Sequence, residues 1–309
     1  MRWEADVRLA DHTRYRIGGP TPRLGHAEGR VDLARTLTRL AGAPYRVLGR
    51  GANLLVADRG IPESVIVLAG EFDALRVGPD HIEAGAAAGL PALVGEARRA
   101  AFAGWSFLEA VPGSVGGGLR MNAGSAEVGL WDRVAWAEAM TADGETIRLT
   151  PAEARPTYRA VGVPESWIFL GARFAASPGN AAEIETEHFT RRRTKVETQV
   201  YDLPSCGSIW KNPGGGWTGA WQLVDRVGMR GARRGDAQIA ERHANFIANL
   251  GEATATDVWW LMAETRRRVR EETGVLLSPE IRLWGFSDEE RADVGATPGD
   301  AASAAGGGM

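Results

Sequence analysis

The chain has 309 residues, of which 44% are hydrophobic and 24% are charged, and its formal net charge is −3. This composition predicts a soluble, globular protein of two or three small domains and excludes a largely disordered chain. It also argues against binding nucleic acid or an anionic membrane through bulk electrostatics. The single cysteine, Cys206, excludes an internal disulfide, and the five histidines lack the paired spacing of a structural zinc site.

Met1-Arg2-Trp3-Glu4 is charged and lacks the apolar core of a secretory signal, so that no such signal is expected. No apolar run reaches membrane-spanning length. We therefore expect a cytoplasmic protein, without a membrane partner, that works as a monomer.

Only two of the 36 basic residues are lysines, Lys195 and Lys211. A lysine kept in so arginine-rich a chain is a candidate for a task that arginine performs differently.

The first half of the chain predicts short strands and hairpins interrupted by two helices. Hydrophobic spacing and turn residues place them in this order: a helix at 30–40, strands at 45–48, 54–57 and 64–68, a hairpin at 75–84, a helix at 91–102, a hairpin at 134–149 and a strand at 167–174. Such irregular alternation favours an α+β fold over a doubly wound parallel sheet.

The second half is more helical. A polar helix is expected at 180–195 and a short one at 218–227, and the Thr-x-x-Asp signal at Thr254 opens a long helix that ends at Gly274. A last strand follows at 281–284, and residues 287–309, which are poor in large apolar side chains, are expected to form a disordered tail.

Two glycine-rich segments could approach a ligand closely. Gly49-Arg50-Gly51-Ala52-Asn53 separates two predicted strands, so that its amides could form an anion site, although an ordinary tight turn explains the same residues. It is not a dinucleotide fingerprint, because the third glycine and the following helix are missing. The segment 112–118 has four glycines in six positions, which suits either a ligand loop or a plain connector.

The polar residues that could carry chemistry are few. Ser208 and Lys211 share one short run with Cys206, but neither a thiol nor a serine nucleophile has its usual sequence context, so that Cys206 is expected to be a buried filler. Taken alone, Arg159 and Glu280 are better explained as solvated surface residues, and His243 is better explained as a core or domain-interface residue.

The order of these segments is more informative than any one of them. The motifs are 12–20, 49–56, 112–124, 158–159, 203–213, 243–247 and 278–282. In this order the chain closely resembles the UDP-N-acetylenolpyruvoylglucosamine reductase family over residues 8–286. The short connection between 213 and 243 is similar to the family's shorter type.

The resemblance implies an α+β fold whose FAD-binding half has two subdomains of the FAD-linked oxidase/reductase type, at 1–72 and 73–194. An α+β substrate domain would follow at 195–286. FAD would lie between these parts. The implied cofactor residues are Gly49, Arg50, Gly51, Ala52, Asn53, Leu54, Pro112, Gly113, Ser114, Gly116, Gly117, Asn122, Gly124 and Arg282.

The resemblance also implies the reaction. NADPH would reduce the flavin, and flavin N5 would then pass hydride to C3 of UDP-N-acetylglucosamine enolpyruvate. Arg159 and Glu280 would stabilise the charge that develops at C2, and Ser208 would donate a proton there. Tyr158, Lys211 and Asn212 would hold the diphosphate and carboxylate region of the substrate.

A few positions depart from the family pattern and leave contact details open. These are Ala52, Trp221, Gln222, Asp236 and Ala240. Two other functions stay open at this point: an FAD-linked oxidase of another small molecule, and a non-enzymatic binding or structural relative.

Overall fold

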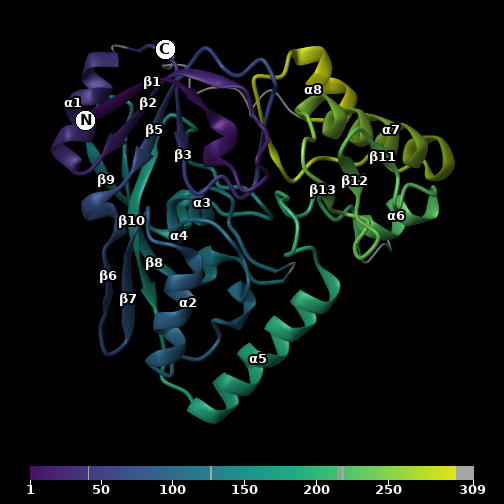
Figure 1. Cartoon of the computed structure of the whole chain (residues 1–309). Helices are drawn as coiled ribbons and strands as arrows, with labels where there is room; N and C mark the ends of the chain where they lie inside the picture. The colour runs from purple at the N-terminus through teal and green to yellow at the C-terminus, as the bar shows by residue number, and fades with distance from the viewer. Residues whose placement is uncertain (41, 126, 215, 217–218, 297–309) are drawn as a thin grey trace.

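Two sheets form the first half of the protein (Figure 1). The computed structural model describes residues 1–40, 42–125, 127–214, 216 and 219–296. The first sheet has the order β1-β2-β5-β3 and the second has the order β6-β7-β10-β8-β9. Their strands are β1 (Arg2–Arg8), β2 (Pro20–Ala27), β3 (Tyr45–Leu48), β5 (Ser64–Leu68), β6 (Leu75–Val77), β7 (His81–Gly85), β8 (Val134–Met140), β9 (Thr146–Leu149) and β10 (Ile168–Ala175).

The second half contains a small three-stranded sheet and most of the long helices. Its strands are β11 (Arg233–Arg234), β12 (Ala237–Ile239) and β13 (Ile247–Asn249). The α-helices of the described chain are α1 (Arg30–Leu40), α2 (Leu90–Arg99), α3 (Val115–Arg120), α4 (Pro151–Ala154), α5 (Ala181–Thr198), α6 (Ala220–Arg226), α7 (Ala255–Thr273) and α8 (Asp288–Val294). Short 3-10 turns are η1 (Leu9–His12), η2 (Gly70–Asp73), η3 (Ser106–Leu108) and η4 (Leu130–Arg133). The α+β prediction is confirmed.

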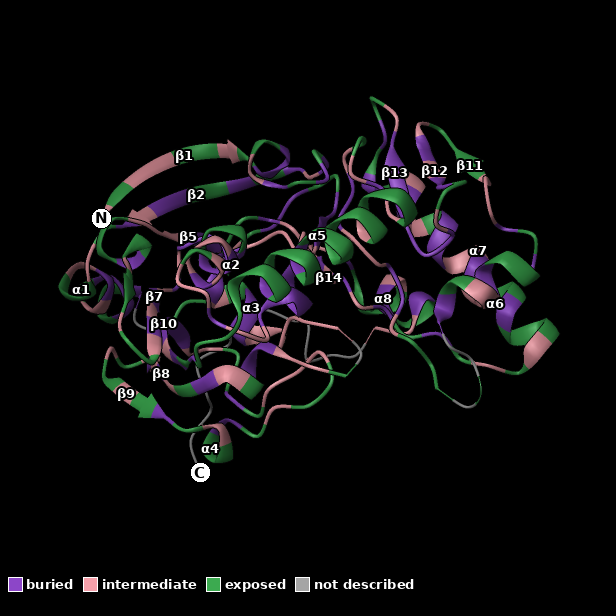
Figure 2. Ribbon diagram, turned by 90° about the horizontal axis from the view of Figure 1, so that it is seen from below, coloured by how far each residue is buried: buried purple, intermediate pink, exposed green. Residues whose placement is uncertain are grey.

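Buried apolar clusters tie the sheets together. Leu33 and Leu37 of α1 share a cluster with Ile168 and Leu170 of β10, so that the first helix packs across both large sheets. The core around α6 and α7 includes Leu55 of the first half. In Figure 2, buried positions are seen along strands such as β2 and β13 and on parts of the helices. Apolar contacts therefore join the two large sheets to each other, and they join the C-terminal region around α6 and α7 to the first half of the chain.

The last strand returns to the first half. The strand β14 (Arg282–Trp284) pairs in parallel with β4 (Leu54–Val56), with Arg282 opposite Leu54. The domain boundaries at 72/73 and 194/195 stay a prediction. The pairing shows, however, that β14, although late in the sequence, belongs to a sheet with a strand of the first half.

Most predicted helices lie where local signals place them. Thr254 accepts a hydrogen bond from the Asp257 amide, and Gly274 ends α7 with φ +72°. Asn180 likewise caps α5, which continues three residues beyond its predicted end. These ends are determined by residues within one turn, and such signals can be read from sequence.

The segment 112–118 differs from the expected loop, because its second half begins helix α3. Ser114 caps this helix by accepting from the Gly117 amide at 3.3 Å. A Cβ on Gly116 would lie 3.0 Å from Ala86 Cβ, and one on Gly118 would lie 3.0 Å from Leu130. The glycines thus allow the helix to pack tightly, which overrides their poor helix propensity.

The prediction of a disordered tail from residue 287 is wrong for its first part. Ser287 caps α8 by accepting from the Glu290 amide, and Val294 is fully buried in the C-terminal core. A capping box and one buried apolar residue outweigh the polar composition. Residues 297–309 of the predicted tail lie outside the described residues. No helix in the described part of the chain has the length and apolarity required to cross a membrane.

Asp58, just after β4, caps α7 from the other half of the protein. Its carboxylate accepts from the amides of Ala255 and Thr256 at 2.8 and 3.0 Å. Asp58→Ala should lower the free energy of unfolding by about 1–2 kcal/mol, because two amides at a helix N-terminus lose their acceptor. Urea denaturation measures this change.

The matched control is Asp202→Ala, which removes an exposed ion pair with Arg242 at 3.3 Å. This change should cost less than about 0.5 kcal/mol. Equal losses in the two variants would contradict the role of Asp58 as a helix cap.

Candidate active site

Two adjoining cavities, each of about 320 Å³, lie where the parts of the protein meet. We call one the sheet cavity, bordered by β3, the start of α3 and residues 165–169. The other is the junction cavity, which is lined by residues 47–54, 110–114, 117–118, 120–121, 123–124, 199–201 and 205–208 and by Glu280, Arg282 and Trp284. They share the lining residues Val47, Leu48, Gly49, Arg50, Ser114, Gly117, Arg120, Arg282 and Trp284. Together they offer an elongated site.

The turn after β3 forms part of both walls. Gly51 has φ +56°, and a Cβ there would collide with the main-chain oxygen of His12. The Gly51 carbonyl accepts from the Arg14 amide at 3.0 Å, so that residues 12–14 support the turn from behind. A Cβ on Gly49 would lie 2.5 Å from Ser114 Oγ. Glycine is therefore required where the two predicted ligand segments meet.

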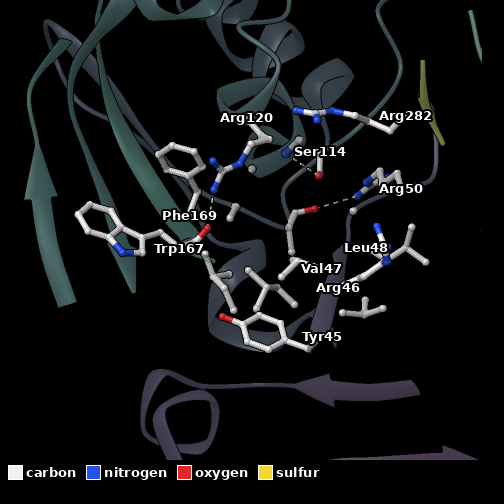
Figure 3. A pocket seen from close by; sticks show the side chains of 18 of the residues that line it. Tyr45, Arg46, Val47, Leu48, Arg50, Ser114, Arg120, Trp167, Phe169 and Arg282 are labelled. Carbon is white, nitrogen blue, oxygen red and sulfur yellow. Dashed lines mark hydrogen bonds between the residues drawn. The ribbon is translucent and has the colours of Figure 1, made fainter. Parts of the chain in front are cut away.

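Positive side chains surround this meeting point. Figure 3 shows Arg50, Arg120 and Arg282 grouped around Ser114 in the sheet cavity. Arg120 donates to the main-chain oxygens of Val163 and Trp167, which holds it in place. Arg282 also pairs with Glu165 at 3.2 Å, but three guanidinium groups around one point still suit an anionic ligand.

Arg159, Ser208 and Glu280, which come from three distant segments, all line the junction cavity. The Glu280 amide donates to the Ile209 carbonyl at 2.7 Å, which places the end of one segment beside the other. Asn245 holds Trp210 from the opposite side: its side chain accepts from the Trp210 amide and donates to the Trp210 carbonyl, both at 2.9 Å. The main chain around Ser208 is thus held on both sides.

The Arg159 guanidinium is positioned by several acceptors. Nε donates to Glu280 Oε1 at 2.8 Å, and the terminal nitrogens donate to the carbonyls of Gly124 at 2.9 Å and Asn122 at 3.4 Å. Its backbone has φ +58°, a strained conformation for a residue with a side chain. Strain of this kind persists only where the surrounding structure imposes it.

Glu280 is a mostly buried carboxyl. Burial raises its pKa, and the opposing charges of Arg159 and then Lys211 lower it by less. The protonated form is therefore more accessible than for an ordinary glutamate, which is the property that a proton-handling group needs.

Four predicted site residues lie outside both cavity walls. The Asn122 side chain donates to the Thr157 carbonyl and accepts from the Trp131 amide, so that it supports the loop carrying Arg159. Tyr158 stacks under Arg159, with the guanidinium carbon 4.8 Å from the ring centroid. Lys211 donates its amide to Ser278, and Asn212 accepts from Ala220 at 3.1 Å. Tyr158 and Lys211 both interact with Glu280.

Some lining residues were missed. Lys195, Gln199, Val200 and Tyr201 enter the junction cavity from the end of α5, and Arg14 enters it from the N-terminal segment. Burial, followed by the nearby charge of Arg191, lowers the pKa of Lys195 to about 8. The only feature of the sequence that had pointed to Lys195 was the scarcity of lysine in the chain. The described residues contain no cluster of three potential metal-ligating side chains.

Comparison with known proteins agrees with this geometry. Residues 28–150 match the FAD binding domain family, and residues 199–284 match the family described as UDP-N-acetylenolpyruvoylglucosamine reductase, C-terminal domain. A UDP-N-acetylenolpyruvoylglucosamine reductase of Acidiphilium cryptum is 41% identical over 283 residues, covering 91% of each chain. The chain belongs to the UDP-N-acetylenolpyruvoylglucosamine reductase family.

Other reductases of the family support the same assignment. "UDP-N-acetylenolpyruvoylglucosamine reductase 2" of Symbiobacterium thermophilum is 40% identical, covering 90% of this chain and 91% of its own. The crystal structure of the Thermus caldophilus reductase superimposes with a TM-score of 0.80 at 38% identity, over 92% of this chain and 99% of that one. The predicted two-part architecture, an FAD-binding half and a C-terminal reductase domain, is confirmed.

FAD is the cofactor of this fold, and the residues present fit it. The contiguous cavities accept an elongated molecule, and glycine backbone lines the point where they meet. The guanidinium groups beside that point complement a diphosphate. Every predicted cofactor residue except Asn122 lines one of the two cavities.

Cys206 lines the junction cavity and is only 1% exposed. Its expected role as a buried filler is confirmed, and burial raises the pKa of its thiol. Native protein should therefore react with a disulfide reagent at pH 8 at least about 100-fold more slowly than unfolded protein, because little thiolate forms. Absorbance of the released thiolate measures this, with guanidinium-unfolded protein as the control. A fast stoichiometric reaction of native protein would be inconsistent with the burial.

Proposed function

We propose that this protein reduces UDP-N-acetylglucosamine enolpyruvate to UDP-N-acetylmuramate with NADPH as the hydride donor. The proposal rests mainly on one observation. Arg159, Ser208 and Glu280, which lie far apart in sequence, line one cavity that continues into the glycine-rich cofactor site. The names of the relatives supply the substrate class.

FAD, when bound, supplies the hydride relay between NADPH and C3 of the enolpyruvyl group. The turn 49–54 and the segment 112–117 would hold the cofactor through backbone amides, with Arg282 beside them. Glycine at 49 and 51 keeps side chains out of this contact.

The catalytic side chains act on the charge that appears at C2 of the substrate. Arg159 is already fixed by carbonyl oxygens, so that its charge is in place before reaction begins. Glu280 in its protonated form adds a hydrogen-bond donor, and its raised pKa supports that state. Ser208 then donates its hydroxyl proton to C2, where positioning matters more than acidity because the carbanion is strongly basic.

The remaining predicted residues bind the substrate beyond Glu280. Tyr158 and Lys211 interact with Glu280, and Tyr158 also interacts with Asn212, which supports a role for these three residues in holding the diphosphate and carboxylate region. We further propose that the enzyme works as a monomer in the cytoplasm.

Replacing Ser208 with Ala tests the proton-donor role. Reduction of bound flavin by NADPH should stay within about twofold of wild type, and product formation should fall by at least about 100-fold, because only the second half-reaction needs this proton. Anaerobic stopped-flow absorbance separates the two half-reactions. Thr in place of Ser208 retains a hydroxyl and serves as the control.

Equal loss of both half-reactions in Ser208→Ala would contradict the assignment. If wild-type protein consumed oxygen with an alcohol or hydroxy acid and ignored the nucleotide sugar, it would be an oxidase. A colourless protein inert to NADPH would favour a non-enzymatic relative.

The lowered pKa of Lys195 leads us to expect that KM for the nucleotide substrate depends on pH. Because its pKa is about 8, its positive charge is present at lower pH and lost as the pH rises through that value. KM for the anionic nucleotide substrate should therefore rise between about pH 7 and pH 9, by up to about tenfold. Lys195→Arg keeps its charge and should give a flat profile over this range. A flat wild-type profile would contradict the prediction.

A further inference from the structure

Helix α5 is a largely exposed helix with few buried attachments. Figure 1 shows it running along the lower edge, beyond α2 and the second sheet. Of its 18 residues only Ile184 and His188 are buried. His188 is a polar anchor, since its side chain is 1% exposed.

Glu109 receives three side chains from one face of this helix. His188 Nδ1 lies 2.8 Å from Glu109 Oε2, and Arg192 lies 3.9 Å from Oε1. Lys195 Nζ donates to the main-chain oxygen of Glu109 at 2.7 Å. Positions 188, 192 and 195 follow one another along a single helix face. Glu109 is therefore the point at which α5 is fastened to the segment after η3.

The segment after Glu109 and the end of α5 both go on to line the junction cavity. Residues 110–114 line the junction cavity on one side, and Lys195 and Tyr201 line it on the other. Tyr201 adds a second connection by donating its hydroxyl to the Ala110 carbonyl at 3.1 Å. A shift at Glu109 would move the cofactor loop and the Lys195 ammonium together.

His188 is an unusual choice for a purely structural contact. Its Nε2 is buried and has no hydrogen-bond partner among the described residues. An unsatisfied ring nitrogen destabilises a protein interior, and an apolar side chain would avoid this cost. The contribution that offsets the cost is the Nδ1 contact to Glu109.

We propose that the buried Glu109–His188 pair is a positioning unit that holds the Lys195 ammonium at the wall of the junction cavity. His188 touches neither cavity, so that it acts only through Glu109 and Lys195. The proposal rests on the proposed function for its kinetic consequence. Its structural consequence, a fixed Lys195, is independent of that function.

The kinetic test compares two substitutions at one position in the holoenzyme. His188→Leu removes the Nδ1 contact, and His188→Asn keeps a donor close to the Nδ1 position. We expect His188→Leu to raise KM for the nucleotide substrate by about five- to tenfold with kcat changed less than about twofold, and His188→Asn to restore most of the loss. If the leucine variant does not fold, Glu109→Gln tests the pair from the other side and leaves the main-chain acceptor of Lys195 in place.

Ser106→Ala is the matched control. Ser106 is buried in η3 and donates to Glu187 of α5, so that this change loosens the same helix without touching Glu109. KM should not change. A double-mutant cycle with Lys195→Met then separates positioning from general loosening, because the effect of His188→Leu should disappear when Lys195 is absent. The same KM increase in the Lys195→Met background, or in Ser106→Ala, would overturn the proposal.

Chemical labelling tests the pair without any substrate. The chain has only two lysines, so that mass spectrometry can follow acetylation of Lys195 against Lys211 as an internal reference. At pH 8, His188→Leu should lower the Lys195 to Lys211 rate ratio several-fold, because an amine released from burial regains an ordinary lysine pKa and is then mostly protonated at that pH. An unchanged ratio would overturn the proposal even in an active enzyme. If wild-type protein did not reduce the nucleotide substrate, the proposed function would fail and the labelling ratio would still decide on the pair.

Discussion

The parallel pairing of β14 with β4 is the interaction on which the site depends. The Arg282 amide donates to the Asn53 carbonyl at 3.0 Å, and the Asn53 side chain donates to the Glu280 carbonyl at 3.0 Å. Glu280 in turn donates its amide to Ile209. One chain of hydrogen bonds thus links the cofactor turn, the glutamate and the segment of Ser208, although Asn53 and Glu280 are 227 positions apart. Backbone ladders of this kind hold positions more firmly than exposed side-chain contacts.

The charges of the site are balanced within this framework. Arg159 and Glu280 pair at 2.8 Å, with side chains 13% and 15% exposed. A pair with so little exposure loses hydration, and it is retained here with further hydrogen bonds to the carbonyls of Gly124 and Asn122. Burial keeps the pKa of the Glu280 carboxyl above its usual range despite the nearby cation. The result is a fixed positive charge beside a carboxyl that can hold a proton.

Glycines and buried polar side chains around the two cavities determine how closely the neighbouring segments approach one another. Gly49 meets Ser114 where a side chain would collide, and Asn245 holds Trp210 from behind. His188 and Glu109 fasten an otherwise exposed helix to the cavity wall. None of these groups needs to touch the substrate, because each one limits the freedom of a residue that can do so. Such support determines precision, which an active site requires as much as its reactive groups.

Local signals in the sequence by themselves determined α1, α5 and α7, because the apolar spacing of α1, the Asn180 cap of α5 and the Thr254 cap of α7 each lie within a few residues. The order of short motifs likewise pointed to Arg159, Ser208 and Glu280. The mixed-charge edge strand β1, the tight helix α3 and the ordered α8 depended on partners elsewhere in the chain. Only the tertiary structure decided that Lys195 enters the cavity, that Asn122 supports a loop and that burial raises the pKa of Glu280. Contact and desolvation arise between segments far apart in sequence, and no local pattern records them.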